Sequence, residues 1–153
     1  MAAIRLKVIR PTFQTLTINE GGEAYKAAGR KINDSATAAN LFSFLAEESK
    51  EFFFAVHLNT KNCVVCIDEV SVGSMTAAVV HPREVFKSAL LSSAAALVFI
   101  HNHPSGDPEP SREDIALTKR LKEAGELLGI RVFDHVVISE YGNYVSLADR
   151  LLI

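Results

Sequence analysis

Two histidines, a serine and an aspartate stand at a spacing that suits a catalytic zinc ion. They are His101, His103, Ser111 and Asp114. Imidazole nitrogens and a carboxylate oxygen are suitable zinc ligands, and three of them leave the fourth corner of a tetrahedron open for water. An open corner distinguishes a catalytic zinc site from a structural one. We therefore predict that His101, His103 and Asp114 bind one Zn²⁺ ion per chain.

The residues before the first histidine predict how the two imidazoles are held. Residues 94–100 are all apolar and indicate a buried strand. Successive side chains of a strand point to opposite faces, so His101 and His103 face the same way. Asn102 points to the other side and is not expected to bind the metal.

The residues after the second histidine predict how the carboxylate reaches the imidazoles. A loop rich in proline, glycine and aspartate turns the chain over residues 104–110. Ser111 then opens an amphipathic helix that runs to Leu128 and ends at Gly129. Asp114 lies on the first turn of this helix, from which it can reach back to the histidines.

The complete spacing resembles a known family signature. His-x-His, seven residues, Ser, two residues and Asp form the JAMM motif of the JAB/MPN metallopeptidases. Residues 81–84, 101–108 and 133–138 are also similar to the bacterial RadC branch of that family. Longer RadC proteins begin with a helix-hairpin-helix-like region, which residues 1–33 do not resemble. We expect residues 1–33 to be an N-terminal extension of unclear role and residues 34–153 to be a RadC-like JAB/MPN domain.

The order of the expected elements indicates an α/β fold with helices flanking a mixed central β-sheet. The resemblance implies a three-layer sandwich related to cytidine deaminases. Hydrophobic periodicity predicts helices over residues 35–49, 83–92 and 111–128, and strands over residues 4–9, 52–58, 63–70, 73–80, 94–100 and 131–138, with a last turn at 141–143.

Hydrolysis by this chemistry needs a general base, and glutamate is a usual choice. The resemblance implies Glu51, which immediately precedes the apolar strand 52–58. Without the resemblance, Glu51 is equally well a solvated residue between a helix and a strand. Glu69 and Glu84 compete for the role, and Glu47 and Glu48 are more distant candidates on the preceding helix.

Ser111 and Asp114 also have ordinary structural interpretations. Ser111 is suited to cap the helix that follows it, a contribution of about 1 kcal/mol. The resemblance implies that its hydroxyl also donates to the oxyanion formed during hydrolysis. Asp114 is equally typical of an acidic residue placed near a helix N-terminus.

The remaining histidines and the two cysteines have structural interpretations first. His57, His81 and His135 are expected to be hydrogen-bonded core or surface residues, although His135 is an alternative candidate for orienting a ligand histidine. Cys63 and Cys66 form a Cys-x-x-Cys pair within an expected strand. Side chains three apart on a strand face opposite ways, so we expect two reduced thiols.

Length, charge and hydropathy limit the classes of function. The 153 residues carry a net charge of −2, so no overall basic field indicates nucleic-acid binding. No apolar run approaches the roughly 20 residues of a membrane span, and no signal peptide is visible. We expect a cytoplasmic protein of one domain that does not bind a membrane, and exposed strand edges would allow a homodimer.

These observations favour a zinc-dependent metallopeptidase or isopeptidase that cleaves an amide bond in a protein or peptide substrate. The alternative is a DNA-repair-associated or DNA-binding protein, a label traditionally given to RadC members. A deaminase is disfavoured because its His-x-Glu and Pro-Cys-x-x-Cys ligands are missing. The tripeptide His-Asn-His at residues 101–103 does not indicate an HNH nuclease, because those nucleases are named for residues that are scattered through their motif and not for a contiguous tripeptide. A metal-free MPN scaffold is disfavoured because such members lack some of the metal ligands, whereas this sequence has all of them.

Overall fold

The computed structural model describes residues 27–73 and 80–153. This part of the chain is an α/β fold with a five-stranded mixed sheet, which confirms the expected fold class. Its elements are α1 (Ser35–Leu41), β1 (Glu51–Leu58), β2 (Val64–Gly73), α2 (Pro82–Leu91), β3 (Ala96–Asn102), α3 (Arg112–Leu128), β4 (Arg131–Ile138) and β5 (Tyr144–Ser146), with two short 3-10 segments, η2 (Ser43–Glu47) and η3 (Glu140–Gly142).

The sheet has the strand order β2-β1-β3-β4-β5. β1 is antiparallel to both β2 and β3, whereas β3 and β4 run parallel and β5 returns antiparallel to β4. A parallel pair requires a crossover connection, and α3 supplies it between β3 and β4. β3 is therefore central, and every one of its residues is buried.

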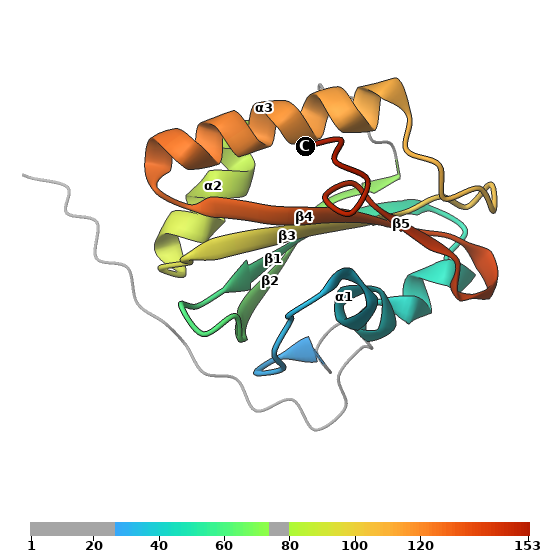
Figure 1. Cartoon of the computed structure of the whole chain (residues 1–153), viewed down its shortest axis with the longest axis horizontal. Coiled ribbons are helices and arrows are strands. Elements are labelled where there is room, and N and C mark those ends of the chain that lie inside the picture. The colour runs from blue at the N-terminus through green and yellow to red at the C-terminus, as the bar shows by residue number, and fades with distance from the viewer. Residues whose placement is uncertain (1–26, 74–79) are drawn as a thin grey trace, which may run out of the picture.

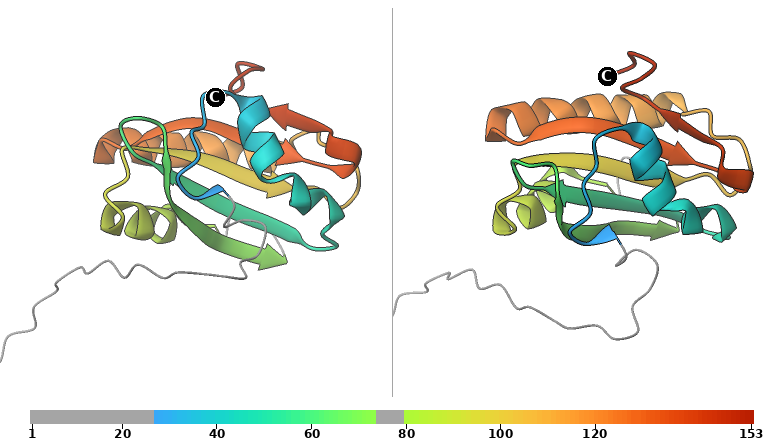
Figure 2. Two further views of the ribbon diagram at one scale, coloured as in Figure 1. Left: turned by 90° about the horizontal axis from the view of Figure 1, so that it is seen from below. Right: turned by 60° about the horizontal axis from the view of Figure 1, so that its bottom comes forward.

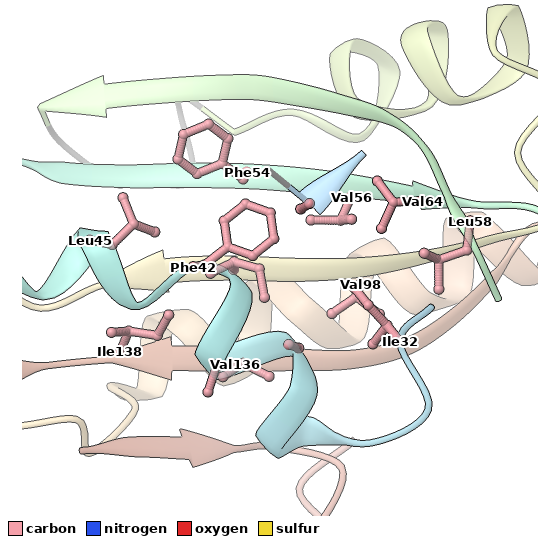
Figure 3. Packing of buried hydrophobic residues seen from close by; sticks show 14 of the residues in the cluster. Ile32, Phe42, Leu45, Phe54, Val56, Leu58, Val64, Val98, Val136 and Ile138 are labelled. Atoms are coloured by element: carbon pink, nitrogen blue, oxygen red, sulfur yellow. The ribbon is translucent and has the colours of Figure 1, made fainter. Parts of the chain in front are cut away.

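Helices cover both faces of the sheet, so the fold has three layers. α2 and α3 lie on one face and α1 lies on the other (Figure 1). The two additional views show the same arrangement (Figure 2). Strand alternation separates two cores: Val98 and Ile100 belong to the core beneath α1, shown in Figure 3, whereas Leu97 and Phe99 face α2 and α3.

The first helix is shorter than predicted. We expected one helix over residues 35–49, but α1 ends at Leu41 and the chain continues as the 3-10 segment η2. Phe42 and Leu45 are three residues apart. Residues at this spacing lie on the same face of an α-helix and of a 3-10 helix, so apolar periodicity does not distinguish the two kinds of helix. The 3-10 turn rises faster per residue and brings the chain to the start of β1 within a few residues.

The C-terminal turn is also more regular than predicted. The residues expected to form a simple turn at 141–143 lie within η3 and the connection to β5. β5 is missing from the expected elements because three residues are too short to show an alternating pattern. The predicted strands at 4–9 and, apart from Gly73 and Val80, at 73–80 lie outside the described residues. In the described part, no helix is long and apolar enough to cross a membrane.

Candidate metal centre

The candidate site lies where the end of β3, the start of α3 and the start of β1 meet. β1 and β3 are antiparallel with Phe53 opposite His101, so the beginning of β1 lies beside the end of β3. Strand alternation places Glu51 on the same face as Phe53 and His101. Helix α3 begins at the same edge, with Asp114 in its first turn. Three separate elements thus contribute to one site.

Three potential metal-binding side chains converge there. His101, His103 and Asp114 each offer one ligand atom, and these atoms lie within 4.8 Å of one another. The two Nε2 atoms are 2.9 Å apart. Asp114 Oδ1 is 3.7 Å from His101 Nε2, and its Oδ2 is 3.5 Å from His103 Nε2.

These separations are of the size that a tetrahedral zinc site requires. Zinc bonds of 2.0–2.1 Å place ligand atoms roughly 3.3–3.4 Å apart in a tetrahedron. The two Nε2 atoms, 2.9 Å apart, are closer than this, and Asp114 offers a different oxygen to each histidine, Oδ1 at 3.7 Å from His101 and Oδ2 at 3.5 Å from His103. The structure therefore brings the three predicted ligands together in a form that could bind a metal, and their role as ligands stays a prediction.

Asp114 is held by a reciprocal hydrogen-bond pair with Ser111. Ser111 is the N-cap of α3, and its Oγ accepts from the Asp114 backbone N–H at 3.1 Å. Asp114 Oδ2 in turn accepts from the Ser111 N–H at 2.7 Å and from its hydroxyl at 2.6 Å. Oδ1 receives no hydrogen bond from any described residue. The capping interaction thus occupies one carboxylate oxygen and leaves the other for a cation.

His103 is oriented by the loop that follows it. Its Nδ1 lies 2.8 Å from the Asp107 carbonyl oxygen, which can only accept, so Nδ1 carries the donated hydrogen. When His103 is neutral, its Nε2 has the lone pair that a metal could bind, and when it is protonated, the Nε2–H donates to His101 Nε2 at 2.9 Å. The loop predicted to turn the chain therefore also directs this imidazole.

His135 joins the site from β4. Its Nε2 is 2.6 Å from Nδ1 of His101, and its Nδ1 is 2.6 Å from the hydroxyl oxygen of Thr118. The sequence left open whether His135 was an ordinary core residue or a partner of a ligand histidine, and the structure places it against His101. Thr118 has no signal in the sequence that distinguishes it from any other buried position of a helix.

Burial and contact set the charges of these groups. Burial, followed by the neighbouring His135, holds the pKa of His101 well below its ordinary value, and burial lowers the pKa of His135 to about 4. The hydrogen bond with Asp114 raises the pKa of His103. Burial opposes ionisation of Asp114, but contacts with His103 and Ser111 outweigh it and lower its pKa. At neutral pH, His101 is therefore neutral and Asp114 is a carboxylate, as metal ligation requires.

The Asn102 side chain forms hydrogen bonds with the backbone on both sides of Glu51. Its Oδ1 accepts from the Phe52 N–H at 2.7 Å, and its Nδ2 donates to the Lys50 carbonyl at 2.9 Å. The paired register of β1 and β3 ends at Phe53 and His101, so the Asn102 amide continues the strand-like hydrogen bonding beyond it. The residue between the two histidines thus positions the backbone of the candidate base.

All five predicted site residues line one pocket of about 260 Å³: Glu51, His101, His103, Ser111 and Asp114. Glu113 also lines it, and no pattern in the sequence distinguishes this residue from other acidic residues at a helix start. Neither Glu69, which is exposed on β2, nor Glu84, which pairs with Lys87, is part of this lining. A hollow of about 340 Å³ beside α1 is larger, but it holds no comparable His/Asp cluster among its lining residues.

The other histidines and cysteines lie elsewhere. His57 is buried, with Nδ1 2.7 Å from the Ser92 hydroxyl, and His81 caps α2 by accepting from the Arg83 N–H. Cys63 and Cys66 are both free thiols, as expected.

The chain is similar to proteins of one family. The RadC-like JAB domain family matches residues 32–152. A UPF0758 protein of Methanosarcina acetivorans is 53% identical over 112 residues, which cover 73% of this chain and 48% of the relative. A UPF0758 protein of Syntrophotalea carbinolica is 47% identical over 130 residues, covering 85% and 57%.

A third relative matches nearly the whole chain. A UPF0758 protein of Caldanaerobacter subterraneus is 42% identical over 152 residues, covering 97% of this chain and 61% of the relative. The chain therefore spans about half the length of the curated relatives it matches. On this evidence, the chain belongs to the RadC-like JAB domain family.

Proposed function

We propose that this protein is a zinc-dependent hydrolase that cleaves an amide bond in a protein or peptide. One observation carries the proposal: the side chains of His101, His103 and Asp114 converge in a pocket that Glu51 also lines. Three zinc-type ligands with a nearby carboxylate form the set of groups that metal-assisted hydrolysis requires.

His101, His103 and Asp114 would hold the ion. When bound, zinc lowers the pKa of a coordinated water to about 7 and polarises a carbonyl oxygen. Glu51 would accept the proton that water loses as its oxygen attacks the amide carbon. Glu51 would then pass this proton to the leaving nitrogen as the carbon–nitrogen bond breaks.

Ser111 would stabilise the developing negative charge on the carbonyl oxygen. Its hydroxyl donates to Asp114 Oδ2 at 2.6 Å in this structure, so it must turn to donate to an oxyanion. The Ser111 N–H also donates to the same carboxylate oxygen, at 2.7 Å, and therefore retains Asp114 when the hydroxyl turns. Capping and catalysis are thus compatible roles for one side chain.

The proposal is tested by peptide cleavage with a defined zinc load. The full chain is reconstituted with one equivalent of Zn²⁺ and incubated with a diverse peptide mixture that includes lysine-linked isopeptides, and the products are identified by mass spectrometry. We expect new carboxyl termini with the wild type and none with Glu51→Gln, which should retain zinc. Glu69→Gln is the matched control and should cleave as the wild type does.

Two outcomes would contradict this proposal. A zinc-loaded wild type that cleaves none of the peptides would refute a peptidase, and equal cleavage by Glu51→Gln would refute the assigned base.

A further inference from the structure

A buried chain of hydrogen bonds connects the candidate ligand His101 to the helix that carries Asp114. It passes from His101 to His135 and then to Thr118, and ends at the backbone carbonyl of Asp114. The side chains of Thr118 and His135 are completely buried, and His101 is 1% exposed. Each link is 2.6 Å long.

The donor and acceptor in each of these hydrogen bonds follow from the Asp114 carbonyl at the end of the series. The Asp114 carbonyl can only accept a hydrogen bond, so the single hydroxyl hydrogen of Thr118 is donated to it. The Thr118 oxygen then has only lone pairs to offer His135. His135 must therefore donate through its Nδ1–H, and as a neutral imidazole it has its lone pair on Nε2.

The same reasoning extends to His101. The lone pair on His135 Nε2 accepts from His101 Nδ1–H, so neutral His101 has its lone pair on Nε2. That nitrogen lies 2.9 Å from His103 Nε2, from which it accepts a hydrogen bond when His103 is protonated, and 3.7 Å from Asp114 Oδ1. We infer that Thr118 and His135 are positioning residues that hold His101 in the tautomer whose Nε2 can bind a metal.

The surroundings of His135 favour this single arrangement. Phe53 and Phe99 meet its ring edge-on, with centroid separations of 5.4 and 6.0 Å. These contacts restrict rotation of the ring, and among the described residues only Thr118 and His101 hydrogen-bond its two nitrogens. Reversing the tautomer of His135 would set two lone pairs against each other at Thr118 and two hydrogens against each other at His101.

This series of hydrogen bonds also connects one candidate ligand, His101, with another, Asp114. The carbonyl that fixes its direction belongs to Asp114, whose carboxylate lies in the same site. A shift of α3 would therefore change the position of the carboxylate and the orientation of the imidazole together. His103 has an additional contact outside this chain of hydrogen bonds: its Nδ1 is directed by the Asp107 carbonyl, while its Nε2 lies 3.5 Å from Asp114 Oδ2.

The inference rests on the proposed function for its link to zinc, but the tautomer can be tested without metal. Long-range ¹H–¹⁵N spectra of the metal-free protein should show Nδ1–H on both His101 and His135. An Nε2–H form of either ring, as its main neutral state, would overturn the inference whether or not the protein binds zinc.

Zinc affinity, measured by chelator competition, supplies the second readout. Thr118→Val removes the acceptor for His135 while keeping the shape of the side chain, and zinc affinity should fall about 10- to 100-fold. Thr118→Ser keeps the hydroxyl and should bind zinc nearly as the wild type does. Unchanged affinity in a folded Thr118→Val protein would overturn the inference. A wild type that takes up no zinc contradicts the proposed function instead and leaves the tautomer experiment to decide this inference.

Discussion

Replacing Asn102 by alanine should destabilise the protein by about 1–3 kcal/mol and leave zinc affinity nearly unchanged. The substitution removes two hydrogen bonds, of 2.7 Å to the Phe52 N–H and 2.9 Å to the Lys50 carbonyl. Each contributes about 0.5–1.5 kcal/mol net, and an orphaned buried donor costs about 1–3 kcal/mol. Lys50 is exposed, so its carbonyl can turn to water, and the Phe52 N–H accounts for most of the loss.

Zinc affinity should stay within about threefold of the wild type because the Asn102 side chain faces away from the imidazoles. Stability is measured by urea denaturation at several protein concentrations, and zinc binding by chelator competition. Asn59→Ala is the matched control, since Asn59 likewise makes two hydrogen bonds to the backbone, accepting from two N–H groups at 2.9 and 3.0 Å, but lies in a more exposed turn. A loss for Asn102→Ala no larger than the control's would refute the reasoning, as would a tenfold fall in zinc affinity.

Three further substitutions test other parts of the structure. Gly125→Ala should lower the melting temperature, because the added Cβ would lie 2.4 Å from the Ile130 carbonyl oxygen. Alanine normally stabilises a helix by about 1 kcal/mol relative to glycine, so an unchanged or higher melting temperature would contradict this prediction. Burial lowers the pKa of His57, so unfolding takes up a proton and the wild type loses stability as pH falls below about 6.5. Urea titrations from pH 7.5 to 5 should show a smaller loss for His57→Gln, and parallel curves would refute it. Ser111→Ala should cost about 1 kcal/mol through the lost cap of α3, whereas Ser111→Thr should retain most of it; equal losses would show that the hydroxyl bond to Asp114 is not the cause.

Local pattern was enough to predict the part of the site that is built from neighbouring residues. His101 and His103 share a face because the extended hydrogen bonding of β3, which ends at Asn102, continues to the His103 N–H, and Asp114 reaches them because Ser111 starts a helix. The apolar run before His101 correctly predicted the buried central strand β3. In each case, the residues concerned are close in sequence and one element sets their direction.

Contacts between elements that are distant in sequence could not be predicted from the sequence pattern. His135 meets His101 only because β3 and β4 pair in parallel, with Phe99 opposite His135. Asn102 reaches the chain around Glu51 only through the antiparallel register of β1 and β3. Thr118 has the same pattern as any inward-facing helical residue. Glu51 itself was selected by resemblance to a family rather than by spacing.

X-ray absorption at the zinc edge tests the central claim most directly. The full chain, loaded with one equivalent of Zn²⁺, should show only nitrogen and oxygen neighbours at about 2.0–2.1 Å, with imidazole scattering that His101→Ala and His103→Ala each reduce. Sulfur neighbours at about 2.3 Å would instead place the ion at Cys63 and Cys66. That result, or a failure of the wild type to retain zinc, would contradict the metal centre described above.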